Sequence, residues 1–138
     1  MDTLTTSQEI LTRLHGATTL PFREAMSARI ASLLEAFQKE SGGVAVSVNS
    51  FQSLLAFLQA HPNLNYPTIT LTPGGDFYAS WKENRTQVFS VQFLDNGQVR
   101  FVVLRTEPTA QLSGLTTPAT LMNLVAPLRV LEWAGNER

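Results

Sequence analysis

The sequence predicts a single α+β domain over residues 1–138, with a four-stranded antiparallel meander and helices packed on one face of it. Two observations predict this class. Between Pro67 and Arg105, apolar and polar residues alternate in four segments joined by short turns, which is typical of antiparallel strands. Before and after that stretch, apolar residues recur every three or four positions, which indicates amphipathic helices. A chain of 138 residues fits one domain with a substantial core.

The composition excludes several classes of protein. Hydrophobic residues make up 43% of the chain and charged residues only 15%, so extended disorder is not expected. The low charge has a second interpretation, which is that another subunit covers part of the surface. A net charge of -1 gives no basic field that would attract nucleic acid. Because the chain has no cysteine, it forms neither a disulfide nor a thiolate metal site.

The sequence shows no targeting or membrane-spanning segment. No apolar run reaches the roughly 20 residues that cross a bilayer. The first residues, from Met1 to Thr6, lack the charged start and the apolar centre of a signal peptide. We therefore expect a soluble, cytoplasmic protein of bacterial origin that does not contact a membrane.

Two helices are predicted before the meander. Thr6 and Glu9 have the spacing of a capping box, and they predict a short helix over roughly residues 7–15. Pro21 suits the first turn of a second helix, which Ser41-Gly42-Gly43 ends. Apolar residues at helical spacing mark the buried face of this second helix: Phe22, Met26, Ile30, Leu33, Leu34 and Phe37.

A short strand and a third helix are predicted next. Val44, Val46 and Val48 alternate with small residues, which favours a strand. Asn49 is placed to cap a helix of about three turns, and His61-Pro62 ends that helix because the residue before proline disfavours it.

Within the meander, alternate residues of each strand share one face. Pro73-Gly74-Gly75 and Asp95-Asn96-Gly97 supply two of the turns. Trp81 has the parity of the core face, so its indole N–H is expected to find a partner nearby. The even-numbered positions form a mixed second face, which becomes more apolar toward the last two strands. The odd-numbered positions are apolar and predict the core face: Ile69, Leu71, Phe77, Ala79, Trp81, Phe89, Val91, Phe93, Val99, Phe101 and Val103.

The end of the chain is predicted to return to a helix. Thr106 to Leu115 are expected to form a loop, because Pro108 and Gly114 interrupt them. Thr117-Pro118 starts the last helix, which Pro127 is expected to kink or break.

The sequence contains no motif for catalysis, phosphate binding or metal binding. His15 and His61 each end a predicted helix, where a cation suits the helix dipole. They do not have the spacing of metal ligands. Asp76 and Asp95 lie in turns, where aspartate bonds its own backbone. We therefore predict no catalytic residue, no metal site and no cofactor.

The second face carries the best candidates for ligand binding. Tyr78 and Lys82 share this face on one strand, Arg100 lies on it in another strand, and Arg85 belongs to the charged loop between strands. A tyrosine among cations could bind an anionic ligand or a single nucleic-acid strand. The same residue types are also what any solvated sheet displays. Arg105 stands at a strand end with the parity of the core face.

The first hairpin, from Pro67 to Trp81, has the pattern Pro-x-Ile-x-Leu-x-Pro-x-Gly-x-x-x-Ala-x-Trp. It is similar to a hairpin in small bacterial proteins of uncharacterised activity. The resemblance covers under a third of the chain, and it implies no activity and no site residue.

These observations favour a non-enzymatic binding or interaction protein that works as a homodimer. The grounds are the low charge, the missing catalytic motif, and the apolar residues Val88, Val102 and Leu104 on the second face. Besides self-association, the expected partner is a protein or a small molecule whose identity the sequence does not give.

Two alternatives stay open at this point. One is a small-molecule-binding domain or small enzyme with a site at the junction of sheet and helices, near Tyr78 and Arg100. The other is nucleic-acid association through residues 82–85 and Arg100, which the net charge disfavours.

Overall fold

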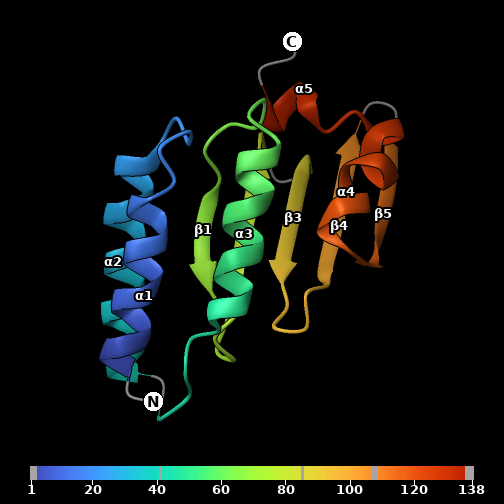
Figure 1. Cartoon of the computed structure of the whole chain (residues 1–138). Helices are drawn as coiled ribbons and strands as arrows, with labels where there is room; N and C mark the ends of the chain where they lie inside the picture. Colours follow the sequence, from blue (N-terminus) through green and yellow to red (C-terminus); the bar gives the residue numbers. More distant parts are fainter. Residues whose placement is uncertain (1–2, 41, 85, 107–108, 136–138) are drawn as a thin grey trace.

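A computed structural model describes residues 3–40, 42–84, 86–106 and 109–135. It shows an α+β fold built on one antiparallel sheet, as predicted, with the strands in the order β1-β2-β3-β4-β5 (Figure 1). The strands are β1 (Thr68–Leu71), β2 (Phe77–Lys82), β3 (Val88–Phe93), β4 (Val99–Thr106) and β5 (Thr109–Thr116). The helices are α1 (Thr3–His15), α2 (Arg23–Glu40), α3 (Val48–Ala60), α4 (Pro118–Val125), the 3₁₀ helix η1 (Ala126–Leu128) and α5 (Leu131–Ala134).

The sheet has five strands, so the prediction of a four-stranded meander is wrong. The stretch from Thr106 to Leu115, expected to be a loop, contains the end of β4 and most of β5. All eight residues of β5 pair with all eight of β4. Gly114 lies opposite Phe101, and an added Cβ would lie 3.5 Å from the ring, in ordinary van der Waals contact. Pro108 lies outside the described residues.

The predicted strand from Val44 to Val48 does not form. Instead, the backbone N–H of Ser47 donates one hydrogen bond of 2.9 Å to Gly75 in the β1–β2 turn. Gly75 has a φ of 92°, and an added Cβ would lie 2.4 Å from the oxygen of Ala45. This close approach gives the segment a packing partner without any strand pairing. Ser47, and not Asn49, caps α3 by accepting from the Ser50 backbone N–H.

The other helix predictions are confirmed with shifted ends. α1 starts at Thr3, so Thr6 lies inside the helix and is buried, and the expected capping box is wrong. α2 starts at Arg23, so Pro21 and Phe22 precede it and the placement of Pro21 in its first turn is wrong; its expected end includes Ser41, which lies outside the described residues. α4 begins after Thr117 as predicted and gives way to the 3₁₀ helix that contains Pro127.

Much of the core lies between α3, α4 and the odd-numbered face of β1 to β4, whereas α1 and α2 lie at the β1 edge, so the prediction that all helices pack on one face is wrong. In Figure 1, α1 and α2 lie beside the β1 end of the sheet, α3 lies in front of the central strands, and α4 lies by β4 and β5. The rings of Phe51 and Phe77 have their centroids 5.3 Å apart, and those of Phe57 and Phe93 are 5.7 Å apart, so α3 packs on the predicted core face. All the predicted core-face residues are buried except Leu71, which is half-buried.

The position of Trp81 confirms the prediction that this odd-numbered residue faces the core and that its indole N–H has a partner. Its side chain is buried, and its indole Nε1 donates a 2.7 Å hydrogen bond to the backbone oxygen of Asn65. Within the described part of the chain, no helix has both the length and the apolar character needed to cross a membrane.

Candidate interaction surface

The second face of the sheet arranges its side chains in rows across the strands. One row runs from Tyr78 through Gln92 and Arg100 to Leu115. Tyr78 and Arg100 are therefore two strand spacings apart, about 10 Å between their backbones. Between them, the amide of Gln92 donates to the Asp76 carboxylate at 3.3 Å. Tyr78 and Arg100 therefore lie on the same face and in the same row, but β3 separates their backbones.

The remaining predicted ligand-binding residues do not join this row. Lys82 lies four residues from Tyr78 along β2, about 13 Å away at the backbone, and its side chain is exposed. Arg85 lies outside the described residues. The cluster of cations around a tyrosine is therefore not assembled by the described residues, although Lys82 and Arg100 share the face.

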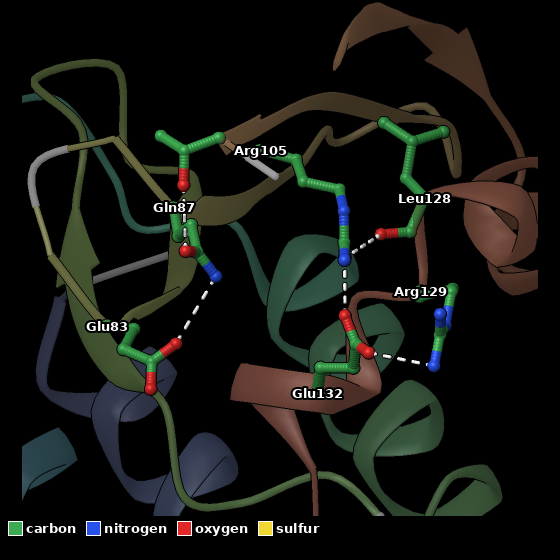
Figure 2. Close-up of polar contacts among 7 residues, drawn as sticks. Glu83, Gln87, Arg105, Leu128, Arg129 and Glu132 are labelled. Carbon is green, nitrogen blue, oxygen red and sulfur yellow. Dashed lines mark hydrogen bonds and ion pairs between the residues drawn. The ribbon is translucent and has the colours of Figure 1, made fainter. Parts of the chain in front are cut away.

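Arg105 lies on the core side, as its parity predicts. It is only 9% exposed, and its guanidinium Nη1 donates to Glu132 Oε1 at 2.6 Å and to the Leu128 backbone oxygen at 2.9 Å (Figure 2). The other oxygen of Glu132 pairs with Arg129 at 2.9 Å. The guanidinium carbon also lies 5.9 Å from the ring centroid of Trp133. These contacts fix the carboxy-terminal segment to β4, so Arg105 has a structural role.

A second polar group in Figure 2 closes the loop between β2 and β3. Gln87 donates from its side-chain amide to Glu83 at 3.2 Å, and the hydroxyl of Thr106 donates to the Gln87 oxygen at 2.9 Å. Asn84 accepts from the backbone N–H groups of Thr86 and Gln87. Glu83, Asn84 and Gln87 thus hold the conformation of the described part of this loop.

The two histidines end helices, as predicted, and the described residues bring neither into a metal site. His15 is exposed, and the guanidinium of Arg23 donates to its backbone oxygen at 2.9 Å. The ring of His61 packs 4.8 Å from that of Phe57, and burial lowers the pKa of His61 because desolvation disfavours the charged imidazole. No group of three or more histidines and carboxylates in the described ranges could hold a metal ion.

The second face carries a contiguous group of apolar side chains, which we call the apolar patch: Val88, Val102, Leu104 and Leu115. Val88 pairs directly with Leu104, and Val102 is the next residue along β4 on the same face. Leu115 pairs with Arg100 and stands diagonal to Val102. Val102 is 36% exposed and Leu115 is 52% exposed. The patch therefore offers apolar surface to solvent near the β5 edge.

Two cations border the apolar patch, because Lys82 stands opposite Val88 and Arg100 stands opposite Leu115. Ser80, Ser90, Val102 and Ser113 form one row across β2 to β5, which makes the middle of the second face flat. The eight residues of β5 include no ionisable side chain. The patch and β5 together make a continuous neutral surface at one end of the sheet.

Two grooves in the described part of the chain lie away from the second face. A groove of about 550 Å³ between α2 and β1 is lined by residues such as Leu33, Phe37 and Leu71. Another of about 470 Å³ lies between α1 and α3. Neither of these two grooves is lined by Tyr78 or Arg100.

The sequence reasoning missed the contribution of β5 to this surface. Ala110, Leu112 and Gly114 alternate with polar residues and share the core side, which was a usable signal for a strand. Leu115 interrupts the alternation because it is apolar but points to the second face, and it is the most exposed member of the apolar patch. Comparison of the chain with models of protein families, with curated proteins and with solved structures finds no significant match.

Proposed function

We propose that this chain is a non-enzymatic interaction protein that works as a homodimer. The observation that carries the proposal is the continuous neutral surface formed by the apolar patch and β5. Leu115 and Val102 are two of the five large hydrophobic residues that are exposed in the described part of the chain, and they are diagonal neighbours on this surface. Apolar surface of this kind marks sites of protein contact.

The charge distribution supports association at this surface. Burying a charged group between two proteins costs free energy unless it is paired, and β5 has no such group to bury. The core of an interface is typically depleted of charged residues. A net charge of only -1 also means that two copies repel each other weakly.

Light scattering coupled to size-exclusion chromatography tests the proposal. At micromolar concentration, we expect a molar mass of twice the 15.2 kDa of one chain. A mass of one chain at every concentration in that range would contradict the homodimer.

A further inference from the structure

We propose that two copies of the protein join by antiparallel pairing of β5 with β5 of the second copy, which continues the sheet across the dimer. This inference rests on the self-association proposed above and names its contact. It concerns the backbone at the edge of the sheet, beside the apolar patch.

The two edges of the sheet differ in how they are covered. At the β1 edge, α2 packs alongside, and Arg29 donates from its guanidinium Nε to the outward backbone oxygen of Ile69 at 3.0 Å. β1 has only four residues. The opposite edge is β5, with eight residues, and Thr109, Gln111, Ser113 and Leu115 are all exposed there. β5 is thus the long edge of this sheet.

The direction of the outer backbone groups follows from the hydrogen bonding of the preceding hairpin. The N–H of Leu94 donates to the oxygen of Gln98, so the even-numbered residues of β4 turn their backbone groups toward β3. The odd-numbered residues of β4 then bond to β5, where their partners are Ala110, Leu112, Gly114 and Thr116. The remaining residues of β5 consequently point their N–H and C=O groups away from β4. These residues are Thr109, Gln111, Ser113 and Leu115.

These outward groups are complementary to those of an identical strand. Two strands related by a two-fold axis perpendicular to the sheet run antiparallel and keep the same faces up. With Leu112 on the axis, Gln111 lies opposite Ser113 of the second copy, and Thr109 lies opposite Leu115 of the second copy. Every outward residue is then part of a hydrogen-bonded pair, which gives about eight N–H···O bonds between the copies.

The side chains of β5 do not prevent this pairing. Natural sheet edges are protected by lysine, proline or a bulge, and the eight residues of β5 include neither lysine nor proline. Their register with β4 is continuous, without a bulge. Stacking of two second faces is a poorer arrangement, because it would desolvate Arg100 beside Leu115. Edge pairing leaves Arg100 in solvent and brings the two apolar patches onto one side of a ten-stranded sheet.

Charge substitutions at Gln111 and Ser113 test both the contact and its register. Both side chains are exposed, so the fold tolerates the changes. In the double variant Gln111→Lys/Ser113→Lys, lysines face each other across the axis, and we expect the dimer to weaken by at least about tenfold. In Gln111→Lys/Ser113→Glu, each lysine faces a glutamate of the second copy, and we expect the dimer to be restored. Gln8→Lys/Thr12→Lys adds the same charge to exposed positions of α1 and is the control that should stay dimeric.

A crosslinking experiment locates the axis. The chain has no cysteine, so Leu112→Cys introduces a single thiol. The two Cα atoms on the axis would face each other at about 4.5 Å, within the range that a disulfide spans. We expect rapid oxidation to a covalent dimer, whereas Leu124→Cys, exposed on α4, should stay largely uncrosslinked under the same conditions. Circular dichroism confirms that each variant is folded.

The outcomes separate this inference from the proposed function. A dimeric wild type that becomes monomeric with Gln111→Lys/Ser113→Lys and is restored with Gln111→Lys/Ser113→Glu supports the pairing of β5. A dimeric wild type that both double variants leave intact, with no crosslink at position 112, overturns the pairing of β5 and leaves the homodimer standing. A monomeric wild type overturns both.

Discussion

The two faces of the sheet are formed by the same strands, but they carry different kinds of side chain. On the core face, Phe77, Phe89 and Phe93 are fully buried and pack against α3 and their neighbours. On the second face, serines form a flat row with Val102, whose side chain is exposed. The difference indicates that the core face holds the fold together, while the second face and its β5 edge are available for association. Substitutions on the two sides should therefore affect different measurements.

Removal of a core-face ring should have the largest effect on stability. Phe93→Ala removes a fully buried ring that contacts Phe57, and we expect it to lower the free energy of unfolding by about 3–5 kcal/mol. Val102→Ala on the second face should lower it by about 1 kcal/mol or less. Urea denaturation of both variants measures the two values. Equal losses at both positions would show that the faces do not differ as proposed.

Two glycines with positive φ separate packing from backbone strain. Gly75 has a φ of 92°, and a Cβ added there would clash with the backbone oxygen of Ala45. Gly97 has a φ of 89°, and a Cβ added there would have no atom within 4 Å. We expect Gly75→Ala to cost about 3 kcal/mol and Gly97→Ala about 1 kcal/mol, because only the first adds a clash to the strain. Thermal or urea unfolding provides the comparison. A difference near zero would mean that the 44–47 segment does not pack tightly on the turn.

The hydroxyl of Ser50 is expected to matter at an intermediate level. It is buried in α3, donates to the Phe93 backbone oxygen, and accepts from the Phe77 backbone N–H at 2.8 Å. Ser50→Ala leaves both backbone groups without this partner, which should cost about 2 kcal/mol. Ser113→Ala, at an exposed position of β5, is the control and should be nearly neutral. Unfolding curves that coincide for the two variants would count against a structural role of the buried hydroxyl.

The smallest expected effect is the pH dependence from His61. Burial lowers the pKa of His61 in the folded state below its usual 6.5. The unfolded state therefore takes up the proton at higher pH, and the free energy of unfolding decreases as pH falls through 6.5 toward the lowered folded pKa. His61→Gln should make the decrease between roughly pH 7 and pH 5 shallower. Denaturation at both pH values checks this, and an unchanged slope would contradict it.

The sequence predicts the core face well because the alternation of large apolar residues within each strand is a strong local pattern. Alternating large residues such as Phe89, Val91 and Phe93 leave one orientation that buries them all. The same local evidence fails for the segment from Val44 to Val48, because alternation does not reveal whether a pairing strand lies beside it. It fails for β5 because Gly114, opposite Phe101, interrupts the apolar alternation that marks a strand.

The candidate surface depends on pairings between residues far apart in the sequence. The second-face parity of Tyr78, Lys82 and Arg100 could be predicted, since it follows from strand periodicity alone. Their separation across the sheet could not, because it requires the register of three strands. The diagonal contact of Leu115 with Val102 likewise depends on the β4–β5 register, whereas the sequence predicts a loop in place of β5.

Sedimentation equilibrium of the wild type beside Gln111→Lys/Ser113→Lys tests most directly whether the β5 edge joins two copies. At the same micromolar concentration, we expect the wild type to have twice the 15.2 kDa mass of one chain and the variant to have the mass of one chain. The same mass for both proteins, whether that of one chain or of two, would contradict association through β5.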